Sequence, residues 1–299
     1  MARTILPYVI SGISVGGQYA LIAIGYTMVY GILRLINFAH GDVFMVAGLM
    51  MVYMAASMPL YLAIPLMIVL TVFLGFLIER VAYRPLRTAP RMSVMISAIG
   101  VSYLIQNLAL YITGGLNKNY PSIPWISDRV TVFGMETSRV TIILVVLLVQ
   151  LINHTKIGMA MRAVSLNFET SQLMGIRINN VISATFIIGT FLAAVGSMLF
   201  FTNYPGVVPT SGAMPGLKAF VAAVFGGIGS IPGAVIGAFI IGIAESLIKG
   251  LDTILIVHGT ITEQIGFATF SDAFTFVLLI IVLVFKPTGL FGEKTTDKV

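Results

Sequence analysis

The chain has 299 residues, of which 58% are hydrophobic and only 9% are charged, and its mean hydropathy is +1.02. A soluble domain carries about 25% charged residues, so this chain lacks the polar surface that one or two soluble domains of this total length would need. Its long apolar runs are typical of transmembrane helices, whereas membrane β-barrels show alternating segments of about 10 residues. The composition therefore predicts an all-α, polytopic protein embedded in a lipid bilayer.

The net charge of +6 comes from 17 Lys and Arg against 11 Asp and Glu. The basic residues separate apolar runs instead of gathering on one face with aromatic residues, so no nucleic-acid partner is expected. The chain has no Cys, and its three His lie in separate segments, so neither a metal site nor a cofactor is predicted. It also lacks a phosphate-binding loop motif and a Ser–His–acid set, so we expect no catalysis and no ATP hydrolysis on this chain.

In chain order, the expected spans are the segments without charged residues. The first, 4–33, would be about 45 Å long as one helix, more than a hydrocarbon core of about 30 Å requires. We therefore expect it to be tilted, or interrupted at one of its glycines. The next run, 43–78, is long enough for two spans, and Ser57-Met58-Pro59 in its middle predicts a tight external turn. Further spans are expected at 93–113, 140–153, 180–202 and 272–285.

The apolar stretch 216–249 contains the sequence GGIGSIPG at 226–233. This segment should break the helix in two, and Gly229, Gly233 and Gly237 would then form a small-residue stripe for close helix contact. An ordinary short loop between two spans is the alternative. The expected fold is a bundle of about eight or nine spans, with broken or re-entrant helices, in one domain over residues 1–299.

Loop charges predict which ends of the spans lie together. Residues 79–91 hold four Arg and one Glu, net +3, and residues 153–178 hold three basic residues and one Glu, net +2. Residues 249–272 hold one Lys and three acids, net −2. Because basic loops are cytoplasmic, the first two loops and the tail from Lys286 are expected inside. Residues 249–272 and the long loop 114–139 are expected outside, and the side of the N-terminus is left open.

Polar or helix-breaking residues at membrane depth are the candidates for a substrate path. The segment Arg34–Asp42 is the most polar stretch between apolar spans, and such groups should be paired, face a cavity or lie at the membrane surface. A plain cytoplasmic turn is the alternative. A second polar set lies in span 93–113, where Ser102 and Gln106 share one helix face, and helix-packing contacts are its alternative. The candidate path residues are Gln18, Asn37, His40, Ser97, Gln106, Gly229 and Gly233.

The two halves of the chain share a faint pattern. An apolar helix leads into a Gly- and Asn-bearing interruption that ends at Gly41, and another leads into the Gly/Pro interruption that ends at Gly233. Paired broken helices in corresponding places are how many transporters build a binding site near the middle of the membrane. A membrane scaffold without transport would leave these paired breaks unexplained.

The cytoplasmic segment 158–176 is amphipathic, and Gly175 is placed to end a short helix there. Such a helix, lying across the cytoplasmic face, would suit the docking of a soluble partner. An ordinary interfacial helix is the alternative.

Several longer motifs are distinctive. They are YALIAIGYTMVYG at 19–31, INFAHG at 36–41, ERVAYRPLR at 79–87, the segment 158–176, the KAF to GGIGSIPGA region at 218–234, and PTGL at 287–290. Together they resemble the LivH permeases of branched-chain amino acid ABC importers, over about residues 8–292. That family also includes permeases for urea, short amides and other amino acids.

The resemblance implies a multi-pass subunit of the bacterial inner membrane. It would pair with a homologous second permease, two cytoplasmic ATP-binding subunits and an external substrate-binding protein, so that ATP is hydrolysed on a separate chain. Residues 154–178 would then contain the coupling helix that contacts the ATPase, with Arg162, Asn167, Glu169 and Gly175 as the coupling candidates.

Two other functions are weighed against an importer of branched-chain or related hydrophobic amino acids. The same machine could carry urea or a short amide, since the scarcity of charge in the spans suits a neutral or zwitterionic solute in either case. A stand-alone, ion-coupled secondary transporter would need an acidic residue deep in a span. We expect Asp42, Glu245 and Asp272 near span ends, which disfavours that class.

Overall fold

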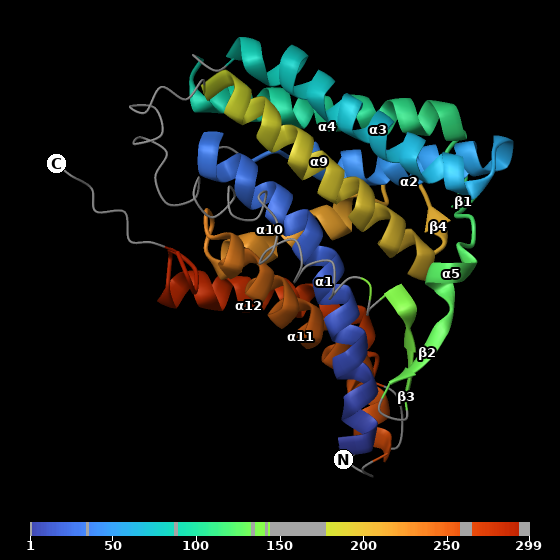
Figure 1. Cartoon of the computed structure of the whole chain (residues 1–299). Coiled ribbons are helices and arrows are strands. Elements are labelled where there is room, and N and C mark those ends of the chain that lie inside the picture. The colour runs from blue at the N-terminus through green and yellow to red at the C-terminus, as the bar shows by residue number, and fades with distance from the viewer. Residues whose placement is uncertain are drawn as a thin grey trace.

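The computed structural model is a bundle of helices (Figure 1), and it describes residues 2–33, 36–86, 89–132, 135–140, 143, 178–257 and 265–292. The long helices are α1 (Ala2–Leu33), α2 (His40–Ser57), α3 (Leu60–Ile78), α4 (Arg91–Thr113), α9 (Ile178–Asn203), α11 (Ile231–Val257) and α12 (Ser271–Phe285). In the described part of the chain, seven helical segments are long and apolar enough to cross a membrane. The all-α, polytopic class predicted from composition is confirmed.

Helix α1 is the central element, and it packs mainly against α11 and α9. It is continuous over its 32 residues, so of the two expected outcomes, tilt or an interruption at a glycine, the interruption is not found. Gly12 and Gly16 instead let α11 approach closely: a Cβ on Gly12 would lie 2.5 Å from the Cα atom of Ile243. A continuous helix of this length would have to tilt in the membrane, and the tilt stays a prediction.

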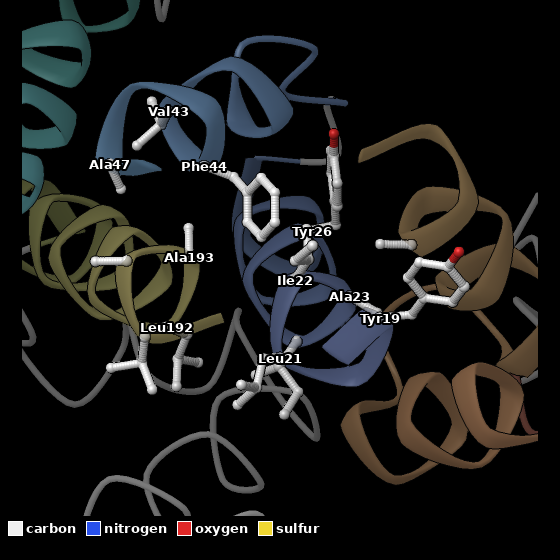
Figure 2. Packing of buried hydrophobic residues seen from close by; sticks show 14 of the residues in the cluster. Tyr19, Leu21, Ile22, Ala23, Tyr26, Val43, Phe44, Ala47, Leu192 and Ala193 are labelled. Atoms are coloured by element: carbon white, nitrogen blue, oxygen red, sulfur yellow. The ribbon is translucent and has the colours of Figure 1, made fainter. Parts of the chain in front are cut away.

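The hairpin of α2 and α3 confirms the two spans expected in 43–78, with the turn at Ser57–Pro59. Beyond Ile78 the helical path continues through a π turn, Glu79–Tyr83, and a 3-10 turn, Arg84–Leu86. Helix α9 packs across both helices of the hairpin. Figure 2 shows the resulting core, in which Phe44 of α2 lies among buried side chains of α1 and α9.

The expected break in 216–249 is confirmed as the turn between a shorter helix, α10 (Ala213–Gly226), and α11. A Cβ on Gly233 would lie 2.4 Å from the carbonyl oxygen of Gly226, so Gly233 permits the close contact of the two helices. Gly229 faces open space, although its φ of +96° favours glycine. Helix α11 also runs on to Val257, beyond the expected end at Lys249.

A small β region lies at one end of the bundle. Strand β1 (Lys118–Asn119) pairs antiparallel with β4 (Gly206–Val207), in the register Lys118↔Val207 and Asn119↔Gly206. Strands β2 (Arg129–Val132) and β3 (Met135–Ser138) form an antiparallel hairpin, with Arg129 opposite Ser138. The remaining short elements are the helix α5 (Pro124–Ser127) and a 3-10 turn at Phe267–Phe270.

The directions of the helices decide which loops lie at the same end of the bundle. Glu79, at the end of α3, bonds Ser183 near the start of α9, and Leu290 and Phe291 donate backbone N–H bonds to the last residues of α10. Figure 1 shows the end of α3 and the end of α12 on the same side of the bundle. The N-terminus lies at the other end, beside β3 (Figure 1). Under the predicted orientation that end is external, and the orientation itself stays a prediction.

Two parts of the sequence-based prediction cannot be compared with the structure. The expected span 140–153 lies outside the described residues except for Val140 and Ile143. The coupling-helix loop 154–178 lies outside them except for Ile178, and so do Arg162, Asn167, Glu169 and Gly175.

Candidate functional site

Helices α2 and α10 begin next to each other, within the bundle. Their first turns contact each other at Gly41, Gly212 and Gly216, and the two backbones are too close for a side chain at any of these positions. A Cβ on Gly212 would lie 2.0 Å from the carbonyl oxygen of Gly41, and one on Gly216 would lie 2.9 Å from the Cα atom of Gly41. The interruption that ends at Gly41 thus contacts the start of α10, whereas the Gly/Pro turn 226–233, with which the sequence paired it, lies at the other end of that helix.

A cavity of about 200 Å³ opens beside this crossing, between α1, the segment before α2, α4 and the start of α10. Its wall is mostly apolar side chains and glycine, with polar groups on one side. The lining residues are Tyr26, Ile36, Phe38, Gly41, Asp42, Ser102, Gln106, Gly212, Ala213, Gly216, Leu217 and Phe220. The mix of apolar wall and few polar groups is typical of small-molecule sites.

Asp42 provides the polar side of the cavity. It lies in the first turn of α2, where the helix dipole favours a carboxylate, and its side chain is buried. The Ser102 hydroxyl lies 2.5 Å from Oδ2 of Asp42, and the Gln106 amide nitrogen donates to Oδ1 at 2.9 Å. The shared face of Ser102 and Gln106 on α4 was predicted correctly. Their partner was missed, because Asp42 is 60 residues from Ser102.

Asn37 and His40 shape the segment that enters α2. Both are buried, and the Tyr83 hydroxyl donates to Oδ1 of Asn37 at 2.6 Å. The ring of His40 packs edge-on against that of Tyr26, with centroids 4.9 Å apart, and its Nε2 has no hydrogen-bond partner in the described part of the chain. The two residues flank the cavity without lining it.

Ser97 and Gln18 lie away from the cavity. The Ser97 hydroxyl donates to the carbonyl oxygen of Ala82 at 3.3 Å, which ties α4 to the turn after α3. Gln18 is fully buried in α1, and neither atom of its amide group is paired within the described residues. Of the predicted path residues, only Gln106 lines the cavity.

Gly229 and Gly233 lie at the opposite end of α10 from the main cavity. A second, narrow hollow extends toward them: it shares Tyr26 and Phe220 with the main cavity and reaches Ile228, the neighbour of Gly229. Its volume of about 10 Å³ has room for about one water molecule, so an amino acid does not fit there.

A partly buried group of charges, which we call the ion-pair cluster, joins α10, α11 and α12. It consists of Lys218, Glu245, Lys249 and Asp272. Lys218 Nζ lies 2.8 Å from Glu245 Oε1 and 2.6 Å from Asp272 Oδ1. Lys249 Nζ lies 2.5 Å from Glu245 Oε1, which confirms the i,i+4 pair expected on this helix. The Tyr19 hydroxyl of α1 donates to Glu245 Oε2 at 3.0 Å.

The cluster corrects the placement of Glu245. We expected this residue near a span end, because Lys249 was taken to end the span, but α11 continues through Val257. Paired charges can stay inside an apolar bundle because two lysines and two carboxylates compensate one another. Asp42 and Asp272 do lie in the first turns of α2 and α12, as expected, so the expected position near a span end is wrong for Glu245 only.

A polytopic bundle in which two helices begin side by side next to a cavity is an arrangement typical of membrane transport proteins. The chain belongs to the family described as the permease component of the branched-chain amino acid transport system, which matches residues 8–283. The chain is accordingly a transport subunit and not an enzyme, and it is a multi-pass protein of the inner membrane. As a permease component, it works with other subunits of a transport system.

Similar proteins include BraD, the high-affinity branched-chain amino acid transport system permease protein of Pseudomonas aeruginosa, which is 39% identical over 98% of each chain. LivH, the permease protein of the same description from Salmonella typhimurium, is 39% identical over 98% of this chain and 97% of the relative. The ribose import permease protein RbsC of Haemophilus influenzae is 25% identical over 78% of this chain and 74% of its own. No solved structure matches the chain significantly. The resemblance drawn from the motifs is confirmed.

Proposed function

We propose that this chain is the membrane-spanning permease subunit of an ATP-driven importer of branched-chain or related hydrophobic amino acids. The observation that carries the proposal is the 39% identity, over nearly the whole chain, to permeases named for branched-chain amino acid transport. The cavity agrees with it, because an apolar wall beside one carboxylate suits a small solute with an aliphatic side chain and a charged end.

The proposed partners are a homologous second permease, two cytoplasmic ATP-binding subunits and an external binding protein. The sequence contains no phosphate-binding loop motif, so ATP would be hydrolysed on the ATP-binding subunits. Their closure would then switch the access of the cavity from one side of the membrane to the other, as a rigid-body or gating movement.

The proposed function is tested with the whole complex in proteoliposomes. Labelled leucine, isoleucine and valine should enter only when ATP and the binding protein are both supplied. Urea and acetamide serve as competing solutes in the same vesicles. Uptake of urea or acetamide in place of the amino acids would reassign the substrate, and uptake driven by an ion gradient without ATP would overturn the proposed class.

We further propose that Arg162 and Glu169 couple this chain to its ATP-binding subunit, with Asn167 and Gly175 in the same helix. Exchanging the two charges, as Arg162→Glu with Glu169→Arg, should lower substrate-stimulated ATP hydrolysis or release the ATP-binding subunit. The reason is that an interface centred on a short helix depends on a few anchoring residues such as Arg. Co-purification and ATP hydrolysis by the reconstituted complex are the measurements.

A matched control exchanges an ion pair at the other end of the bundle. Arg139 Nη1 lies 3.4 Å from Asp128 Oδ2, and both side chains are exposed. Asp128→Arg with Arg139→Glu should leave retention of the ATP-binding subunit unchanged. Wild-type hydrolysis, retention and uptake in the Arg162/Glu169 exchange would show that segment 158–176 is merely interfacial.

A further inference from the structure

Among the described residues that line the cavity, Asp42 is the one charged side chain. Ser102 and Gln106 are neutral, and the other lining residues are apolar, aromatic or glycine. Although only 2% of Asp42 is exposed to solvent, it lines this space together with Ser102 and Gln106, the two side chains that its carboxylate contacts. Within the described part of the chain, a solute in the cavity therefore meets a single carboxylate.

The charge of Asp42 has no cationic partner in the part of the chain that the structure describes. Its contacts are a hydroxyl and an amide. Glu245 is a second carboxylate that is buried to a similar degree, and it pairs with both Lys218 and Lys249. Buried carboxylates are normally paired with a cation, because the loss of hydration is otherwise uncompensated. The two donors and the helix dipole at the start of α2 supply only part of that compensation.

Most of the other described residues that line the cavity are apolar. Phe38, Leu217 and Phe220 come from the segment before α2 and from α10. Burial of an aliphatic side chain against such a wall is favourable in proportion to the apolar area removed from water. The cavity thus combines one negative group with an apolar surface, in a volume that suits a small solute.

We infer that Asp42 is a specificity-determining residue that receives the ammonium group of the solute during passage, while the side chain of the solute packs on Phe38, Leu217 and Phe220. The inference rests on the proposed function in taking the cavity as part of the transport path. It assigns the cavity to primary amines with a short aliphatic side chain, and it disfavours urea, amides and other solutes without a cationic group.

The test uses the full complex with Asp42→Asn, which keeps the shape of the side chain and an acceptor for Gln106 but removes the charge. Vesicles with the binding protein should show a fall in the maximal rate of leucine uptake of about tenfold or more. The leucine concentration at half-maximal rate should change little, because the binding protein captures the solute first. Asp42→Glu, which restores the charge, should recover part of the rate.

The complex without the binding protein provides a direct binding measurement. Labelled leucine should be displaced from the wild-type complex by leucinol, which keeps the ammonium group, and not by isocaproate, which lacks it. Asn107→Ala is the control variant, because Asn107 neighbours Gln106 but does not line the cavity, and its side-chain amide donates to the carbonyl oxygen of Tyr103 on its own helix. This variant should transport leucine at the wild-type rate.

The outcomes separate this inference from the proposed function. If the Asp42→Asn complex takes up leucine at the same maximal rate as the wild-type complex, the role of Asp42 is overturned and the proposed function stays intact. A wild-type complex that imports another amine in an Asp42-dependent way would support the role of Asp42 and overturn the proposed substrate. If Asp42→Asn fails to assemble with the ATP-binding subunits, the wild-type competition decides, and displacement of leucine by isocaproate but not by leucinol overturns the inference.

Discussion

Replacing Lys218 with methionine should destabilise the protein by about 1–3 kcal/mol, because the buried carboxylate of Glu245 loses one of its two cationic hydrogen-bond donors. Lys218 is 6% exposed at its side chain and contacts both Glu245 and Asp272. Methionine has a similar length but no charge, so Asp272 would lose its cation and Glu245 would keep only Lys249. The midpoint of thermal unfolding of the purified subunit in detergent is the measurement.

Two further variants make this result specific. Lys249 is 47% exposed at its side chain, so Lys249→Met should have a smaller effect than Lys218→Met. Adding Glu245→Gln to Lys218→Met should recover part of the lost stability, since the two residues are in direct contact and their effects are then not additive. Equal effects of Lys218→Met and Lys249→Met would contradict a central role for Lys218 in the cluster.

Gly212→Ala should remove most of the uptake while the protein still inserts and assembles. The added Cβ would meet the carbonyl oxygen of Gly41 at 2.0 Å, so the first turns of α2 and α10 must move apart. Overpacking of this kind costs about 1–3 kcal/mol. More importantly, it displaces the helix starts that line the cavity. Leucine uptake by proteoliposomes, normalised to the amount of inserted protein, is the measurement.

Gly100→Ala is the matched control for that substitution. Gly100 lies within α4, and a Cβ there would meet no atom within 4 Å. Alanine also has the better helix propensity, by about 1 kcal/mol, so this variant should be at least as stable as the wild type and transport normally. Full uptake in Gly212→Ala would show that the α2–α10 crossing accommodates an added Cβ and that transport does not depend on this close contact.

Both predictions concern α10, which is held at its two ends. At the cavity end it crosses α2 at Gly212 and Gly216 and joins the ion-pair cluster through Lys218. At its other end, Phe225 and Gly226 accept backbone hydrogen bonds from the chain after α12. Since Lys218 also bonds Asp272 in the first turn of α12, we expect α10 and α12 to move together when access to the cavity changes.

The membrane class, most helix bounds and the family could be predicted from the sequence, because they depend on local or additive properties. Charge-free runs match α4, α9 and α12 to within two residues, and the turn at Ser57–Pro59 follows from proline and run length. Pairs within one helix were also predictable, since i,i+4 spacing puts two side chains on one face whatever surrounds the helix. Lys249 with Glu245 is such a pair, and Ser102 with Gln106 is another.

The partners across helices were decided only by the tertiary structure. Asp42 meets Ser102 across 60 residues, and Lys218 meets Glu245 across 27. Gly41 and Gly212, still further apart along the chain, touch at the start of two helices. The periodicity of one helix says which of its faces is polar, but not which other helix that face meets or at what height. The pairing of helix faces depends on how all the helices pack together. This packing places the polar segment before α2 beside the short helix α10, and the cavity lies between them.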